Sequence, residues 1–188
     1  MSSMIHSFRN AVAEWIDQSL QADVYVSSAG RNALDPELID AARALPGVNA
    51  LSQTRRSQRM LDSGPISVIG LDLPLAGRDS IDWIAGDQAR VWDALAAGDA
   101  VISEPLATRL HLAPGDTLSL PAASGPTAVR IAAIYRDFAS SQGALTLALA
   151  HYQRLFADTR IGAIGIYADQ ASVASIVAAL QSRVENSP

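Results

Sequence analysis

Apolar residues recur every three or four positions in three segments of the chain, which is the pattern of an amphipathic helix. The first segment is 4–20, with the stripe Ile5, Phe8, Val12, Trp15, Ile16 and Leu20. The last segment is 170–186, with the stripe Val173, Ile176, Val177, Leu180 and Val184. Between them, 35–46 begins with a capping Asp35 and Pro36 and ends before Gly47. The pattern predicts helices at both ends of the chain and a third near its beginning.

Alternating apolar and polar residues predict strands at 22–28 and 48–61, so the chain opens as β-α-β, and a short strand at 63–73 begins the next part. Segment 144–158 is typical of a strand running into a helix, and 161–169 of another strand. The chain therefore also closes with alternating strands and helices.

The middle of the chain has shorter elements. Segment 76–99 is polar and loop-rich, and predicts one or two helical turns around Trp92. A strand at 100–102 then leads into a short helix from Ser103, with Leu106 and Leu110 facing inward. After a Pro-Gly-Asp turn come strands at 117–120 and 127–138, and alternation predicts one shared face for Val129, Ile131, Ala133 and Tyr135.

These elements predict an α+β fold made of two parts. Residues 1–62 and 139–188 would form a split βαβ layer with helices on one face. Residues 63–138 would form a small β-rich subdomain inserted into it, because short strands alternate there with Gly/Pro turns.

Composition excludes several classes of function. The chain has 188 residues, of which 49% are hydrophobic and 18% charged, so it can bury a core. A net charge of −5 argues against nucleic-acid binding. The absence of cysteine excludes disulfides and thiolate chemistry. Neither a signal peptide nor a transmembrane span is visible.

Candidate catalytic and metal-binding residues are sparse. The three histidines, His6, His111 and His151, are far apart and lack ligand-type neighbours at metal-site spacing, so we expect no metal site. The chain contains no G-x-S-x-G motif, dinucleotide fingerprint or P-loop, and we expect no cofactor. The acidic residues of 72–93 could hold a cation, but their irregular spacing favours solvated loop charges; they are Asp72, Asp79, Asp82, Asp87 and Asp93.

Candidate contact residues come from two stretches. The sequence "RRSQR" places Arg55 and Arg59 on one strand face and Arg56 on the other, which suits a charged exposed edge or a docking patch for an acidic partner. Trp83 lies in a polar segment, where a tryptophan either packs under a loop or marks a contact surface. We therefore consider Trp83, Arg55 and Arg59 as partner-contact residues.

Several motifs recur in a familiar order: "SFRNAVAEWIDQSLQADVYV", "LPGV", "GDAVISEPLATRLHLAPGDTL" and "IAAIYRDF", followed by a polar loop and Gly143. In this order they resemble the extracytoplasmic domain of MacB/FtsX-type ABC transporter permeases, over about 7–184. The stretches 98–118 and 131–143 carry the most specific part of the resemblance.

The resemblance implies a non-catalytic domain in the periplasm, attached to the inner membrane by its own transmembrane helices. It also implies a cytoplasmic ABC ATPase as the source of motion. The domain would couple that motion to the export or extraction of a lipid, lipoprotein or similar substrate, or to a periplasmic partner. It further allows a homodimer in the full transporter and implies outward extension of a membrane helix at 4–20.

Two alternatives remain open from the residues alone. A periplasmic ligand-binding module would need a pocket of a few hundred cubic ångströms between the two parts. A small soluble α/β hydrolase would need His111 or His151 within hydrogen-bond reach of a carboxylate such as Asp137, in a cleft.

Overall fold

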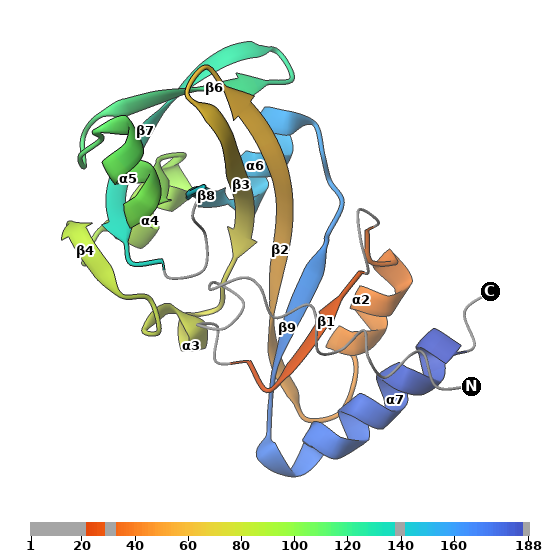
Figure 1. Cartoon of the computed structure of the whole chain (residues 1–188). Coiled ribbons are helices and arrows are strands. Elements are labelled where there is room, and N and C mark those ends of the chain that lie inside the picture. The colour runs from red at the N-terminus through yellow and green to blue at the C-terminus, as the bar shows by residue number, and fades with distance from the viewer. Residues whose placement is uncertain (1–21, 29–32, 138–141, 186–188) are drawn as a thin grey trace.

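The computed structural model describes residues 22–28, 33–137 and 142–185. Within them, nine strands form one mixed sheet in the order β1-β9-β2-β3-β8-β5-β7-β4, with β6 paired to β7 (Figure 1). The strands are β1 (Val24–Ser27), β2 (Val48–Leu61), β3 (Gly64–Asp72), β4 (Trp83–Gly86), β5 (Ala100–Ser103), β6 (Thr117–Ala122), β7 (Gly125–Tyr135), β8 (Ala144–Ala148) and β9 (Ala163–Ala168). This mixed sheet with helices has the predicted α+β class.

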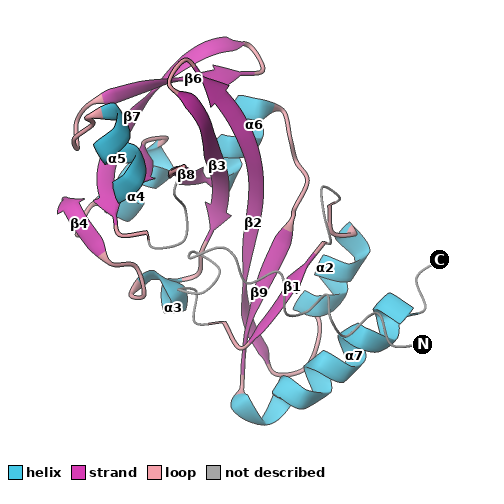
Figure 2. Cartoon of the chain, in the orientation of Figure 1, coloured by secondary structure: helices cyan, strands magenta, loops and turns pink. Residues whose placement is uncertain are grey.

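Six α-helices of the described residues pack on the sheet, and a 3-10 turn (η1, Gln170–Ser172) precedes the last of them. They are α2 (Pro36–Arg43), α3 (Leu75–Arg78), α4 (Val91–Ala97), α5 (Glu104–Leu110), α6 (Leu149–Phe156) and α7 (Val173–Glu185). Figure 2 shows α2 and α7 together at one end of the molecule, away from α4, α5 and α6. The predicted helix 4–20, with Trp15 and His6, lies outside the described residues. No helix in the described ranges is both long and apolar enough to span a membrane.

The long strand β2 joins the two ends of the sheet. Its first half, Val48 to Thr54, pairs antiparallel with β9. Its second half, Gln53 to Leu61, pairs antiparallel with β3 in a hairpin. Beyond Thr54, β3 is the only strand partner of β2 among the described residues. The second half of β2, which carries the arginines, therefore has one edge without a strand partner in the described chain. In the order of the sheet, β2 as a whole lies between β9 and β3.

Three apolar cores lie on this sheet. The α5–α6 core consists of Ile66, Val68, Ala100, Ile102, Leu106, Ala107, Leu120, Val129, Ile131, Ile134, Leu145, Leu147, Tyr152 and Phe156. The α4 core consists of Ile69, Leu71, Leu73, Val91, Leu95, Val101, Ala133, Tyr135, Ala144 and Tyr167. The α2–α7 core consists of Val24, Leu34, Ile39, Ala42, Leu149, Ile161, Ile164, Ile166, Ile176 and Leu180. Alternate residues of β3 serve the first two cores, so this strand is covered on both faces.

The stretch 98–120 forms a strand–helix–turn–strand unit, as predicted. Ser103 precedes α5, but its Oγ accepts a hydrogen bond from the backbone of Ala144 at 2.9 Å and does not cap the helix. Leu106 is fully buried, and Leu110 packs at the margin of the same core. Gly143, at φ +80°, presses so close to α5 that a Cβ there would lie 2.7 Å from the Leu106 Cβ. The short helix is therefore anchored to β8 by both a polar and an apolar contact.

Two details differ from the sequence-based predictions. Strand β4 was expected to be loop, and it forms by pairing with β7 across an irregularity at Ile84. The single face predicted for Val129, Ile131, Ala133 and Tyr135 is wrong, because the pairing of β5 with β7 shifts register between Ile131 and Ala133. Val129 and Ile131, before the shift, enter the α5–α6 core, whereas Ala133 and Tyr135, after it, enter the α4 core.

Candidate functional site

Trp83, the first residue of β4, sits in an aromatic cluster. Its ring meets Trp92 edge-on at 6.1 Å and Tyr135 edge-on at 6.4 Å between centroids. The Arg78 guanidinium lies over the Trp92 ring at 4.7 Å. Burial raises the pKa of the Tyr135 hydroxyl, which stays neutral at physiological pH. Edge-on aromatic pairs contribute about 0.5–1.5 kcal/mol each, so the half-buried Trp83 is held in a fixed orientation.

Two exposed apolar side chains belong to the same stretch of the chain as Trp83. Leu75 on α3 is 76% exposed and Ile84 on β4 is 40% exposed, and with Met60 they are the large hydrophobic residues recorded as exposed in the described chain. The sequence indicates Ile84 as a candidate surface residue, because it forms an apolar pair with Trp83 in a polar segment. The sequence indicates Leu75 less clearly, because it is a single apolar residue after Pro74 at the start of a polar segment. We call Leu75, Trp83 and Ile84 the β4 ledge.

Arg55 is only 9% exposed, and it is committed to an ion pair inside the fold. Its Nε donates to Asp158 Oδ2 at 2.9 Å, and Arg160 donates to the same carboxylate at 2.8 and 3.1 Å. Burial acts to raise the pKa of Asp158, but the hydrogen bonds from Arg160 and Arg55 outweigh it and hold this pKa at about 2. Sequence spacing could not reveal the pair, because 103 positions separate its members.

Arg59 also packs within the molecule. Its guanidinium carbon lies 4.4 Å from the centroid of the Phe156 ring, and Nη1 donates to the Gln58 carbonyl at 3.3 Å. Its Nε is buried without a hydrogen-bond partner among the described residues. The structure therefore separates the three predicted contact residues: Trp83 lies on β4, while Arg55 and Arg59 lie on β2 and contact the segment at and after α6.

The two described histidines belong to different helices, His111 to the end of α5 and His151 to α6. His111 is exposed and closes α5 in a left-handed conformation with φ 53°. His151 is half-buried on α6, where burial and the nearby Arg154 lower its pKa. None of the hydrogen bonds recorded among the described residues involves either ring. In the same ranges, no group of three or more His, Asp or Glu is placed to hold a metal ion.

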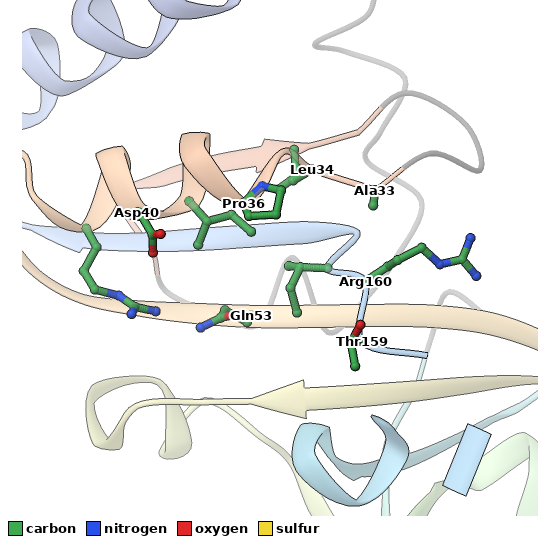
Figure 3. Close-up of a pocket in the computed structure, with 10 residues that line it drawn as sticks. Ala33, Leu34, Pro36, Asp40, Gln53, Thr159 and Arg160 are labelled. Carbon is green, nitrogen blue, oxygen red and sulfur yellow. The ribbon is translucent and has the colours of Figure 1, made fainter. Parts of the chain in front are cut away.

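One pocket of about 370 Å³ opens beside α2. It is lined by Ala33, Leu34, Pro36, Ile39, Asp40, Arg43, Gln53, Thr159, Arg160 and Ile161. Figure 3 shows Pro36 and Asp40 of α2 facing Gln53 of β2, while the Arg160 guanidinium points away from Asp40. All lining residues belong to 1–62 and 139–188, so the pocket does not lie between the two predicted parts.

Comparison of the sequence with known protein families identifies the family of this chain. Residues 1–183 match the MacB-like periplasmic core domain family. The chain belongs to this family. It is also 28% identical over 202 aligned positions to Rv0987, an uncharacterized ABC transporter permease of Mycobacterium tuberculosis. That alignment covers 97% of this chain and 23% of the relative, so the chain spans less than a quarter of the relative's length.

Solved structures of extracytoplasmic transporter domains have a fold similar to that of this chain. The extracellular domain of the noncanonic ABC-type transporter YknZ from Gram-positive bacteria matches with a TM-score of 0.57 at 14% identity, covering 87% of this chain and 93% of that one. The periplasmic region of MacB from Actinobacillus actinomycetemcomitans matches with a TM-score of 0.52 at 12% identity, covering 87% and 92%. The resemblance inferred from the motifs and the α+β fold class are both confirmed. The chain is an extracytoplasmic domain of the ABC transporter permease type.

Proposed function

We propose that this domain is a non-catalytic coupling element, which transmits ATP-driven motion of membrane helices to a substrate or partner outside the inner membrane. The observation that carries this proposal is the single sheet in which β2 pairs with β9 at one end and with β3 at the other. Elements packed in this way move as one body. A displacement at the α2–α7 end would therefore reach the β2–β3 hairpin.

The proposal includes the division of the chain into 1–62 with 139–188 and an inserted 63–138. Supporting it, the α2–α7 core draws its residues from 24–42 and 149–180 alone. The α4 core draws all but Ala144 and Tyr167 from 69–135. In this arrangement the first part faces the membrane helices and the inserted part faces the periplasm.

The partners follow from the same proposal. They are the permease's own transmembrane helices, a cytoplasmic ABC ATPase, and a lipid, lipoprotein or periplasmic protein as the object moved or contacted. A homodimer in the full transporter is part of the proposal. Among the three predicted contact residues, Trp83 remains in it, because Arg55 and Arg59 are engaged within the fold.

The test uses spin labels, because the chain has no cysteine of its own. Single cysteines would be placed at the exposed Ser63 in the β2–β3 turn and Ala174 on α7 of the full transporter in nanodiscs. A third label would sit in the membrane part. We expect the distance from Ser63 to Ala174 to stay constant between the nucleotide-free and trapped ATP states, while both distances to the membrane label change. Unchanged distances to the membrane label would contradict the proposal.

The pocket beside α2 favours a second candidate function, binding of a small ligand. Its volume of about 370 Å³ falls in the range of small-molecule sites. Fragment screening by NMR on the full chain would test it, with Gln53→Trp as the variant that fills the pocket. Fragments that bind and are lost in this variant would support the candidate; an absence of hits at the lining residues would remove it.

A further inference from the structure

We propose that the outer side of β4 and the β4 ledge bind an extended, basic segment of a partner protein, which adds to the sheet as a further strand. This rests on the proposed function, since it names the kind of partner that a coupling domain would contact. Three independent features carry it: an open strand edge, an exposed apolar surface and the local charge.

The first feature is the strand edge. β4 ends the sheet, and β7 is its only strand partner among the described residues. The backbone groups on its other side are therefore available to a new strand. Protein edges are usually protected by lysine, proline or inward charges, but Trp83–Gly86 has the sequence WIAG and contains neither charge nor proline. Two protective devices are present, the shortness of the strand, which has four residues, and the irregularity at Ile84.

The second feature is the β4 ledge, of which Trp83 and Ile84 belong to the edge strand itself and Leu75 to α3. Leu75 and Ile84 are 76% and 40% exposed, so covering them would remove apolar surface from water. Trp83 is already fixed by Trp92 and Tyr135, so a partner would not have to order it. An exposed apolar residue next to a rigid aromatic, as Ile84 is to Trp83, is typical of the centre of a binding site. β1, at the other end of the sheet, has no exposed large hydrophobic residue.

The third feature is charge. Segment 72–93 contains five aspartates and two arginines. Arg136, which follows β7, pairs with Asp82 at 3.2 Å, so these residues together carry a net charge of −2. Arg78 is stacked on Trp92 and Arg90 lies 3.7 Å from Asp87. No ion pair is recorded for Asp79 or Asp93 within the described ranges. A basic segment complements this surface, whereas a second copy of the chain would bring another net charge of −5.

The test is a titration of the full 188-residue chain with a ten-residue peptide of alternating Arg and Val, blocked at both ends. Binding and amide hydrogen exchange would be followed by NMR. We expect saturable binding, at least tenfold slower exchange at amides of 83–86, and weakening when salt is raised from 50 to 300 mM. A peptide of alternating Glu and Val is the charge control and should bind at least tenfold more weakly.

The decisive variant is Ile84→Lys, which places a positive charge on the edge as natural edge strands do. It should weaken Arg–Val binding at least tenfold. Met60→Lys is the matched control, because Met60 is 70% exposed in the β2–β3 hairpin and receives the same change. No binding, protection away from β4, or equal binding by both variants would overturn the inference.

The outcome separates this inference from the function on which it rests. Peptide binding at β4 without nucleotide-dependent movement of the spin labels would retain the edge site and overturn the coupling role. Movement without peptide binding at β4 would retain the coupling role and overturn the edge site.

Discussion

The α2–α7 end and the β5–β7 end of the sheet achieve burial in different ways. At the first end, two amphipathic helices pack on β1, β9 and β2 through one core. At the second end, strands β3, β8, β5 and β7 are covered on both faces by short helices and by the folded-over β6 (Figure 1). Burial at the first end depends on the apolar faces of helices, which are visible in the local sequence pattern. Burial at the second end depends on contacts between segments that are distant in the sequence. The comparison shows which part of the fold follows from local sequence patterns and which part depends on contacts between segments that are distant in the chain.

The strongest test of this comparison asks whether the two ends unfold together. Leu145 and Ile166 are fully buried, the first in the α5–α6 core and the second in the α2–α7 core. Leu145→Ala and Ile166→Ala should each lower the free energy of unfolding by about 2–5 kcal/mol. Because β2 and β3 are hydrogen-bonded along their hairpin, we expect one shared transition in urea, followed by circular dichroism and by hydrogen exchange of β8 and β9. Two separate transitions would mean that the ends are independent units.

The same contrast explains what could be predicted from the sequence. Helix α2 and most of α7 were predicted because their stripes and caps are local, and Asp35 does accept from the Glu37 backbone at 2.9 Å. Strand β4 was missed because Trp83 and Ile84 are adjacent and do not alternate, so only the pairing with β7 reveals the strand. The predicted exposure of Arg55 failed for a similar reason, since its partner Asp158 belongs to a distant loop.

A tight contact at the junction of the two ends gives the second prediction. A Cβ added at Gly70 of β3 would lie 2.7 Å from Cβ and Cγ of Tyr152 on α6. Gly70→Ala should therefore displace α6 and cost about 1–3 kcal/mol of unfolding free energy. Gly162→Ala is the matched control, because its nearest atom would be the Thr54 carbonyl oxygen at 3.6 Å, and it should change stability by less than about 0.5 kcal/mol. Equal effects in thermal unfolding would show that α6 tolerates the shift.

The buried ion pair of β2 supplies the third prediction. Asp158→Asn leaves Arg55 without its charged partner in a site where both side chains are 10% exposed, and should cost about 1–3 kcal/mol at pH 7. The pKa of Asp158 is lowered from an ordinary 3.8 to about 2, so its contribution is complete above about pH 4 and is lost as pH falls through about 2. Urea unfolding across this range should show wild type and variant converging at low pH. A constant difference would mean that the carboxylate charge is not the cause.

The exposed ion pair at the β4 end gives the smallest expected effect. Asp82 and Arg136 are 3.2 Å apart with side chains 60% and 45% exposed, so Asp82→Asn should cost less than about 1 kcal/mol, and 0.5 M salt should remove most of the difference. The backbone bond from Arg136 to the Asp82 carbonyl, at 2.9 Å, survives the change and keeps β4 in place. Thermal unfolding of wild type and variant at two salt concentrations measures this difference in stability. A larger loss would mean that the acidic residues around Trp83 serve the fold. A small loss leaves their charge available for binding, in contrast to the buried carboxylate of Asp158.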